Sequence, residues 1–375
     1  MKVLVSGDFC PKYRVENAVK EKRFGDLFDD VRPIIDSVNY SIVNFEFPIV
    51  LNQKDANPIP KCGPNLQGTI EAVEAVKYAG FDCCTLANNH ILDQGEKCCL
   101  DTKQELERAG IDTVGVGCNL DKASNILYKK INEETLAIIN CCEHEFSIAA
   151  ETAAGANPLN PIQQFYKIKE AKSKADYVLV IVHGGHEHYQ LPSPRMQETY
   201  RFFIDAGADA IINHHQHCYS GYEVYNTKPI FYGLGNFCFD SLNEDHSIWN
   251  EGYLVEVEFK KDNISYMIHP YIQCNESVGV SLMKERQFDN FQKSITKLNN
   301  VIANSKNLKQ EWLFWMQNND GVFRNVIEPY SNRITCKLFR LGLLPSFAKK
   351  KKYRLINYLQ CESHLDRLLN HIINL

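Results

Sequence analysis

Residues that can bind metal ions follow several short apolar runs of the sequence. Carboxylate, imidazole and side-chain amide groups are all present, in the set Asp8, Glu46, Asn89, His183, His215 and His217. This mixture of oxygen and nitrogen ligands suits Mn, Fe or Zn ions, whereas a set rich in thiolates would indicate structural zinc. In sites with two ions about 3.5–4 Å apart, the metals stabilise the attacking and the leaving oxygen of an in-line displacement. The residue types therefore favour two divalent ions and hydrolytic chemistry.

Each of these residues taken alone is weak evidence for a metal site. An aspartate such as Asp8 after a strand is more often a turn or capping residue, and a single histidine such as His183 is more often structural. The cluster of His214, His215 and His217 is stronger evidence. Three imidazoles within four residues repel one another when protonated and gain little in a hydrophobic core, so metal binding explains them better.

The candidate ligands share one position relative to the predicted strands. Five apolar runs are predicted as strands, at residues 3–6, 41–45, 83–86, 177–182 and 209–212. Each run is followed closely by one of the polar residues named above. Loops converge at the carboxyl ends of strands in α/β sheets, so we expect these side chains to meet at one edge.

Predicted helices alternate with these strands, which indicates an α/β fold. Residues 253–260 alternate in polarity and are predicted as a half-exposed strand that forms a hairpin with residues 264–271. From residue 288 onward the apolar spacing is helical. We therefore predict an α/β domain over residues 1–285 and a helical extension over residues 286–375.

Several short phrases of the sequence resemble the CapA family, which is linked to capsule and poly-gamma-glutamate synthesis. In chain order they are Gly7-Asp8, Asn44-x-Glu46-x-Pro48, Leu86-Ala87-Asn88-Asn89-His90-x-Leu92-Asp93-x-Gly95, His183-x-Gly185-x-Glu187, Gly207-Ala208-Asp209, His214-His215-x-His217 and Leu234-Gly235-Asn236-Phe237. The resemblance spans about residues 1–270. The family is similar to calcineurin-like phosphoesterases, so the resemblance implies a metallophosphatase-like four-layer sandwich of two mixed sheets flanked by helices.

The resemblance also implies a role for each candidate ligand. Asp8 and His217 would hold a first metal ion, and Glu46 would take the place of the bridging aspartate. The second ion would be held by Asn89, His183 and His215. Asn89 and His90 would be the catalytic residues, and His90 could stabilise developing charge or protonate the leaving oxygen.

Three further positions are candidates for the same site. Cys10 stands where phosphoesterases usually carry histidine, and its thiolate could bind a metal or play no part. Glu187 could orient a histidine or contact the substrate. His214 belongs to the histidine cluster without an assigned role.

Two functions from different classes remain open at this stage. The first is a metal-dependent hydrolase, a phosphoesterase of the CapA type, acting on a small anionic or phosphorylated substrate or on an anionic polymer. The second is a non-catalytic assembly or regulatory component of anionic polymer synthesis that retains the fold. A nucleic-acid-binding protein is disfavoured, because the basic tail lacks the aromatic and basic interleaving of a known module.

The net charge of −5 is distributed unevenly along the chain. Residues 290–375 contain 14 Lys and Arg against five Asp and Glu, a charge of +9, so residues 1–289 carry −14. Basic and apolar residues interleave over residues 333–354 with no acidic residue among them, which fits either a solvated helix face or a peripheral membrane contact. We find no secretory signal and no apolar run of membrane-spanning length, so we expect a cytoplasmic protein, with peripheral membrane association as the alternative.

Overall fold

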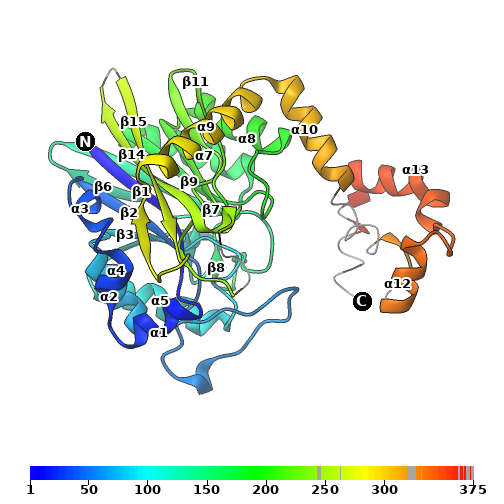
Figure 1. The fold of residues 1–375 in the computed structure, drawn as a ribbon, viewed down its shortest axis with the longest axis horizontal. Coiled ribbons are helices and arrows are strands. Elements are labelled where there is room, and N and C mark those ends of the chain that lie inside the picture. The colour runs from blue at the N-terminus through cyan, green and yellow to red at the C-terminus, as the bar shows by residue number, and fades with distance from the viewer. Residues whose placement is uncertain are drawn as a thin grey trace. The chain divides into compact units, whose positions relative to one another are not determined.

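The computed structural model describes residues 1–242, 246–261, 263–318, 327–330, 332–361, 364, 365, 367, 368 and 372. These residues form two compact units, Met1–Lys309 and Gln310–Leu375. The first unit contains every strand found among the described residues (Figure 1). It also contains the candidate metal ligands.

The first unit is built around two mixed sheets. The larger sheet has the strand order β16 (Val280–Leu282), β15 (Asn263–Gln273), β14 (Glu251–Lys260), β1 (Lys2–Cys10), β2 (Tyr40–Phe45), β3 (Cys83–Thr85) and β4 (Asp112–Val114), and β13 (Asn236–Phe239) also pairs with β1. The smaller sheet has the order β11 (Tyr222–Tyr225), β12 (Lys228–Phe231), β10 (Ala210–His214), β9 (Tyr177–His183), β7 (Glu134–Cys142) and β6 (Leu127–Ile131). A separate two-stranded ladder joins β5 (Val116–Gly117) to β8 (Gly155–Ala156).

Parallel and antiparallel pairs coexist in each sheet. In the larger sheet β1, β2, β3 and β4 pair in parallel, whereas β14 is antiparallel to β1 and to β15. In the smaller sheet β7, β9, β10 and β12 are parallel, and the edge strands β6 and β11 are antiparallel. The parallel strands are buried on both faces, as expected for strands covered by other layers.

The two sheets pack face to face, and helices cover their outer faces. Between the sheets lies a core in which Val5 and Ile42 of the larger sheet share a cluster with Ile138, Leu179 and Ile212 of the smaller one. A second core joins the other face of the larger sheet to helices α1 (Arg14–Lys20), α2 (Phe24–Phe28), α3 (Arg32–Ile35), α4 (Glu71–Ala79) and α5 (Gly95–Arg108). Helices α7 (Pro161–Lys174) and α8 (Pro194–Ala206) contact the smaller sheet, and the short α6 (Leu120–Ala123) lies beside β5. The predicted fold class, a four-layer sandwich, is confirmed.

The predicted hairpin is present, but one detail of it was wrong. β14 and β15 pair in antiparallel register from Glu251–Ile272 to Lys260–Asn263. β14 is almost wholly buried, not half-exposed, because Tyr253, Val255 and Val257 face the inner core while Leu254 belongs to the outer one. Alternating polarity in a strand indicates a solvent-exposed face only where no other part of the protein packs on that face.

The compact unit runs beyond residue 285, where the sequence places the domain boundary. Helix α9 (Glu285–Ile302) follows that point directly, and its Phe291 and Ile295 are buried in the inner core. The Phe291 ring lies 4.8 Å from that of Tyr219 and 5.8 Å from that of Tyr253. The later helices are α10 (Ser305–Asn318), α12 (Arg333–Arg340) and α13 (Phe347–Gln360). In the described part of the chain no helix combines the length and the apolar character needed to cross a bilayer.

Candidate metal centre

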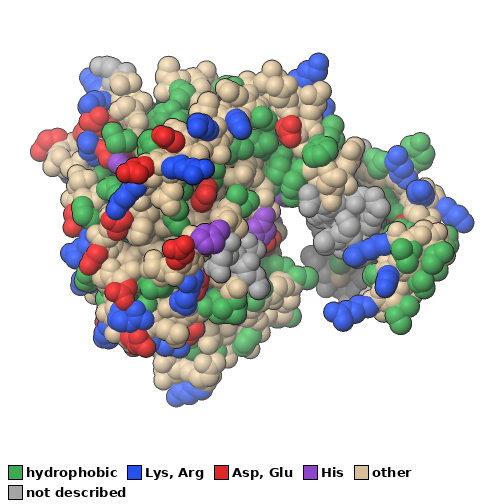
Figure 2. Space-filling view, in the orientation of Figure 1, with side chains coloured by type: hydrophobic (Ala, Val, Ile, Leu, Met, Phe, Trp, Pro, Cys, Tyr) green, Lys and Arg blue, Asp and Glu red, His purple; other side chains and the backbone are tan. Residues whose placement is uncertain are grey.

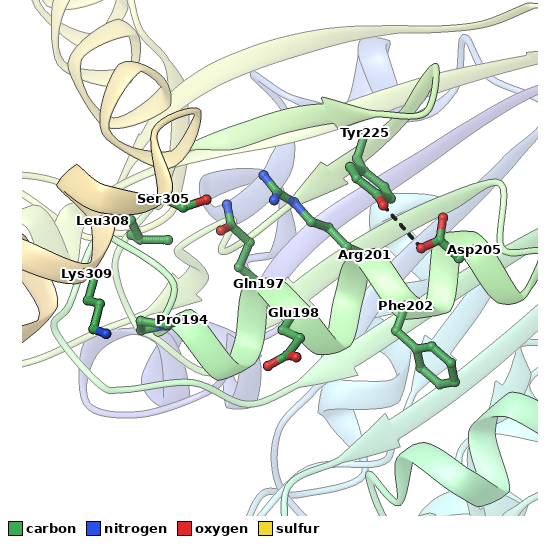
Figure 3. Close-up of a pocket in the computed structure, with 10 residues that line it drawn as sticks. All are labelled: Pro194, Gln197, Glu198, Arg201, Phe202, Asp205, Tyr225, Ser305, Leu308 and Lys309. Carbon is green, nitrogen blue, oxygen red and sulfur yellow. Dashed lines mark hydrogen bonds between the residues drawn. The ribbon is translucent and has the colours of Figure 1, made fainter.

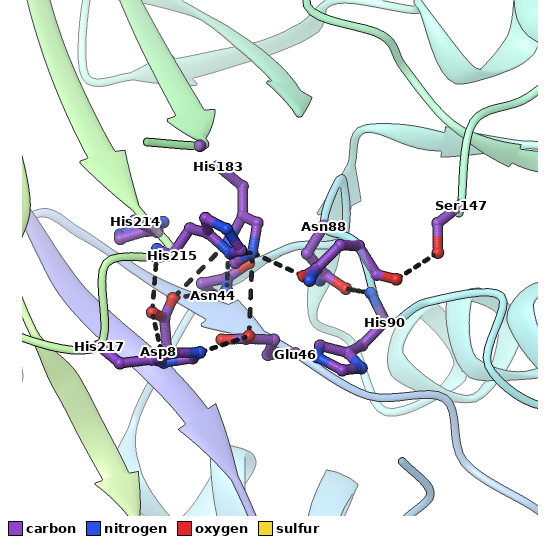
Figure 4. A network of polar contacts seen from close by, with 12 residues as sticks. Asp8, Asn44, Glu46, Asn88, His90, Ser147, His183, His214, His215 and His217 are labelled. Atoms are coloured by element: carbon purple, nitrogen blue, oxygen red, sulfur yellow. Dashed lines mark hydrogen bonds and ion pairs between the residues drawn. The ribbon is translucent and has the colours of Figure 1, made fainter. Parts of the chain in front are cut away.

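Side chains from both sheets meet where the parallel strands end (Figure 4). Asp8 stands near the end of β1, Glu46 directly follows β2, and His183 is the last residue of β9. His215 and His217 lie in the loop after β10. All five side chains are buried, although each could ionise. The structure therefore brings together the residues that the sequence predicts at this edge.

Glu46 lies between two groups of candidate metal ligands. Glu46, Asp8 and His183 form one group and Glu46, His215 and His217 the other, and within each group the ligand atoms lie within 4.8 Å of one another. Glu46 Oε1 is 3.8 Å from His183 Nε2 and 3.8 Å from His217 Nε2. A carboxylate shared by two groups fits the bridging role that the resemblance implies for Glu46.

Three of the predicted ligands converge on one point beside this carboxylate. His183 Nε2 lies 3.0 Å from Asn89 Oδ1 and 3.1 Å from His215 Nδ1. Two donor atoms bound to one ion at about 2.1 Å and at a right angle to each other are ~3.0 Å apart. Both distances from His183 Nε2 are thus those of neighbouring ligands to one ion.

Glu46 has an electrostatic environment that a cation would relieve. Neither of its carboxylate oxygens has a hydrogen-bond partner among the described residues, and the side chain is fully buried. Burial, and then the negative charge of Asp8, raise the pKa of this carboxyl well above its ordinary value. A buried acceptor without a partner is costly, so the residues present fit a bound divalent cation.

Two histidines of the site, His183 and His217, are held in the form that binds metals. Burial and the neighbouring imidazoles lower the pKa of His183 well below its ordinary value. Burial also lowers the pKa of His217, to about 4. Both rings are therefore neutral near pH 7, and a neutral imidazole offers the lone pair that a metal ligand needs.

Two asparagines orient the candidate ligands, and the sequence analysis assigned neither of them a role. The Asn44 amide donates to Asp8 Oδ1 at 2.7 Å and lies 3.3 Å from His183 Nδ1. Asn236 Oδ1 lies 2.9 Å from His217 Nδ1. Groups that hold the second nitrogen of a ligand histidine fix the orientation of its ring. Both asparagines stand in the quoted CapA phrases, which is the signal that could have identified them.

The backbone at the site is constrained by close approach and by unusual torsion angles. A Cβ atom on Gly7 would lie 1.8 Å from the carbonyl oxygen of Gly235, so only glycine lets β1 approach that loop before Asp8. His215 and His217 have φ angles of 92° and 54°, in the region that favours glycine. Such torsion angles in residues other than glycine persist where the surrounding structure imposes them, typically at functional sites.

His90 lies at the edge of the site and is held by a buried aspartate. Asp93 Oδ2 is 2.6 Å from His90 Nδ1, which leaves Nε2 as the ring nitrogen available to a substrate. Lys61 forms an ion pair with Asp93 and lies 3.1 Å from His90 Nδ1. Lys61 stands in a stretch rich in Pro, Asn and Lys, which is typical of a surface loop, so the sequence did not indicate this buried contact. Nothing in local spacing connects a lysine of that loop to the histidine 29 positions further on.

The three additional candidates differ in their relation to the site. Cys10 is buried, and burial followed by the charge of Glu46 raises the pKa of its thiol well above the ordinary value. His214 is buried at the end of β10. Neither residue belongs to the two ligand groups found among the described residues. Glu187 is exposed in the loop after β9, and its charge contributes to the raised pKa of Glu46.

A hollow lies elsewhere on the first unit, between α8 and the start of α10 (Figure 3). Its volume is about 490 Å³. Its arginine, Arg201, donates to both carboxylate oxygens of Glu223, at 2.9 and 2.6 Å, and Tyr225 donates to Asp205 at 3.2 Å. Arg201 and Asp205 are thus already paired, and no group of metal-competent side chains is found at this hollow among the described residues.

The sequence matches a family model over the region that carries the site. The model described as "Bacterial capsule synthesis protein PGA_cap" matches residues 2–241. That range includes every candidate ligand from Asp8 to His217. The chain belongs to this family. The resemblance read from the sequence motifs is thereby confirmed.

Two curated relatives in this family show how far the similarity extends. The chain is 35% identical to the capsule biosynthesis protein CapA of Bacillus anthracis over 240 residues, which cover 62% of this chain and 58% of that relative. It is 32% identical to the PGA biosynthesis protein CapA of Bacillus subtilis strain 168 over 282 residues, which cover 74% of this chain and 73% of that protein. The solved structure of a 5′-nucleotidase from Candida albicans SC5314 is a weaker match, with 12% identity, 84% of this chain and 57% of that chain covered, and a TM-score of 0.42.

Proposed function

We propose that this PGA_cap family member is a metal-dependent hydrolase that acts as a phosphoesterase. The observation that carries the proposal is Glu46, a buried carboxylate without a hydrogen-bond partner, at the centre of two groups of metal-competent side chains. A core carboxylate with a structural role would accept hydrogen bonds, as buried polar groups generally do.

Six side chains of this chain would hold two divalent ions, Mn, Fe or Zn. Glu46 would be shared, because it belongs to both groups, and the other ligands would be Asp8, Asn89, His183, His215 and His217. When bound, such ions supply a nucleophilic hydroxide at neutral pH and stabilise charge on the phosphoryl oxygens. The two ligand groups pair Asp8 with His183 and His215 with His217, so which ligand serves which ion stays a prediction.

His90 would act on the leaving group through its Nε2 atom. Asp93 can accept from Nδ1 and orient the ring, and a His90 ring protonated on both nitrogens would then donate the proton of Nε2 to the departing oxygen. The Asn88 side chain fixes the backbone of the same turn, since its Oδ1 accepts from His90 N at 3.1 Å while its amide donates to Phe45 O at 2.9 Å. Asn89 and His90 are thereby presented together from the loop that follows β3.

We further propose that the substrate belongs to the synthesis of an anionic capsule polymer. Both CapA relatives bear names from capsule or PGA biosynthesis. The substrate would be a small phosphorylated or otherwise anionic compound, or the anionic polymer itself. An anion fits the site because bound cations and a neighbouring lysine, Lys61, would attract it.

The test begins with the metal content of the full chain. Protein purified without chelator and reconstituted with Mn²⁺ is analysed for metals, then assayed against phosphomonoesters, phosphodiesters and γ-glutamyl polymers. We expect close to two ions per chain, and each of His183→Ala and His215→Ala should lose one ion while the chain stays folded. His246→Ala, which removes an exposed histidine outside the site, is the matched control and should keep both.

Two outcomes would reject the proposal at different levels. A failure to bind metal after reconstitution would refute the proposed metal centre. It would favour the alternative, a non-catalytic component of polymer synthesis. Protein that binds two ions but hydrolyses no phosphoester would leave the metal centre standing and refute the phosphoesterase activity.

A further inference from the structure

The C-terminal unit presents basic and apolar side chains together on two short helices. Residues 333–361 contain eight Lys and Arg and no Asp or Glu. α12 carries Arg333, Lys337 and Arg340, spaced to share one helix face, and α13 begins with a run of four lysines at 349–352. Figure 2 shows the blue basic and green hydrophobic side chains side by side on this unit.

The two helices are fixed to one another by contacts within the unit. Glu328 caps α13 by accepting from Ser346 Oγ, from Phe347 N at 2.8 Å and from Ala348 N at 3.2 Å. The Tyr330 ring packs against Phe339 of α12 at 5.1 Å and against Phe347 of α13 at 6.2 Å. The turn between the helices includes Gly342, whose φ is 74°. This arrangement already uses some of the apolar side chains for internal packing.

Other apolar side chains of the same segment are left in solvent. Ile334 is 72% exposed, Leu341 64%, Leu343 67% and Tyr353 84%. These four residues come from both helices and from the turn that joins them. They lie close to the basic residues in the sequence, and on α12 Ile334 stands beside the face that carries Arg333, Lys337 and Arg340.

A groove in this unit combines the same two chemistries. It has a volume of about 780 Å³, and its lining includes the apolar Phe339, Leu344 and Leu355 with the basic Arg340, Lys349 and Lys352. The lining also includes Glu328, whose carboxylate caps α13, and the other charged side chains of the lining are basic. Apolar and basic side chains together suit an amphiphile that has a negatively charged head and a hydrocarbon tail.

We propose that α12, α13 and the turn between them form a peripheral binding surface for anionic lipid bilayers. The basic residues attract the negative headgroups, and the exposed apolar residues enter the interface below them. A soluble polyanion, such as nucleic acid or a capsule polymer, would use the charges but would leave the four exposed apolar side chains in water. The apolar residues therefore favour a membrane over a polyelectrolyte. This inference does not depend on the proposed hydrolase activity.

Co-sedimentation of the full chain with vesicles tests the surface. Vesicles of phosphatidylcholine alone are compared with vesicles that also contain phosphatidylserine, at low and at high salt. Each Lys or Arg near an anionic surface contributes roughly fivefold to the partition coefficient. The variant Lys349→Gln/Lys350→Gln/Lys351→Gln/Lys352→Gln should therefore bind at least a hundredfold more weakly.

Two further variants separate the contributions. Ile334→Ser/Leu341→Ser/Leu343→Ser keeps every charge, and it should lose at least tenfold in binding. The control Lys122→Gln/Lys130→Gln/Lys261→Gln/Lys293→Gln removes the same charge from exposed lysines of the first unit, and its binding should stay within about twofold of wild type. Circular dichroism verifies that each variant is folded.

Several outcomes would overturn the proposal. They are failure of the wild type to sediment with phosphatidylserine vesicles, equal loss of binding in the control variant, and full binding by the serine variant. Tight binding of duplex DNA or poly-γ-glutamate that the serine variant retains would identify the surface as a polyelectrolyte site instead.

Discussion

Replacing Glu46 by glutamine should have opposite effects on metal binding and on the stability of the metal-free protein. The change keeps the volume of the side chain and removes its charge. Because Glu46 belongs to both ligand groups, we expect Glu46→Gln to reduce the metal content from about two ions per chain to fewer than one. Loss of the stabilisation by Mn²⁺ should follow, which for the wild type is about 4 kcal/mol at a metal concentration of 1,000 Kd.

In the metal-free protein, the same substitution should increase the stability of the fold. Glu46 is buried without a hydrogen-bond partner and next to Asp8, so its charge opposes folding when no cation is bound. A buried unsatisfied polar group costs roughly 1–3 kcal/mol, and a charged one costs more. Glutamine remains a buried polar group but carries no charge, so we expect Glu46→Gln to raise the free energy of unfolding of the chelator-treated protein by on the order of 1 kcal/mol.

The stability difference between Glu46→Gln and the wild type should change with pH in a direction that can be checked. The folded-state pKa of Glu46 is raised above its unfolded value, so the folded protein binds this proton more tightly than the unfolded chain does. Stability from the proton is fully present below the unfolded pKa of about 4.3 and is lost as the pH rises toward the folded value. The advantage of Glu46→Gln over the wild type should accordingly grow with pH in that window.

Urea denaturation of chelator-treated protein at several pH values measures the change, with Asp209→Asn as the matched control. Asp209 is also buried, but it accepts from Lys172 at 2.7 Å, Lys228 at 2.9 Å and Val178 N at 2.9 Å. Neutralising it should destabilise the protein and leave the metal content unchanged. If Glu46→Gln kept two ions, or destabilised the metal-free protein as Asp209→Asn does, the reasoning about Glu46 would be refuted.

Three other changes test different parts of the site. His90→Ala should lower turnover by ~10²–10⁴-fold with metal content preserved, and by less for aryl phosphates with good leaving groups; an equal loss for all leaving groups in steady-state assays would count against the acid role. Gly7→Ala should displace the Gly235 loop, because the new Cβ would lie 1.8 Å from the carbonyl oxygen of Gly235. Unfolding measurements should therefore show a clear destabilisation, and an unchanged stability would contradict the packing argument. Cys10→Ala should retain both ions in elemental analysis, because burial raises the thiol pKa and disfavours the thiolate that a metal would need; loss of an ion would make Cys10 a ligand.

Much of the site could be predicted because its ligands follow a rule of sheet architecture. Asp8, Glu46 and His183 each stand at or just after the end of a short apolar run, and parallel strands bring such positions to one edge. The strands themselves could be predicted because strands buried on both faces are continuously apolar. The fold class followed from the same alternation of strands and helices together with the CapA resemblance.

What could not be predicted depends on contacts between distant segments. Lys61 reaches Asp93 from a loop whose composition indicates only surface exposure, and the pairing exists because the chain folds that loop over the turn that carries His90. β14 was expected to be half-exposed, since its polarity alternates, yet it lies between β1 and β15 with cores on both sides. Burial of this kind depends on how the sheets and helices pack on one another, and the polarity pattern of a single strand does not encode it.

Two independent costs in the protein point to the same missing partner of the site. His215 and His217 adopt backbone torsion angles that cost on the order of 1–3 kcal/mol each in residues other than glycine. Glu46 adds the cost of a buried carboxylate without a hydrogen bond. No hydrogen bond or packing contact of the described residues relieves Glu46, whereas a cation beside it would satisfy the carboxylate and use the two histidines in the orientation that their backbone imposes. The strain and the buried charge are both understandable if the chain binds a cation at this position, because binding would then offset both costs.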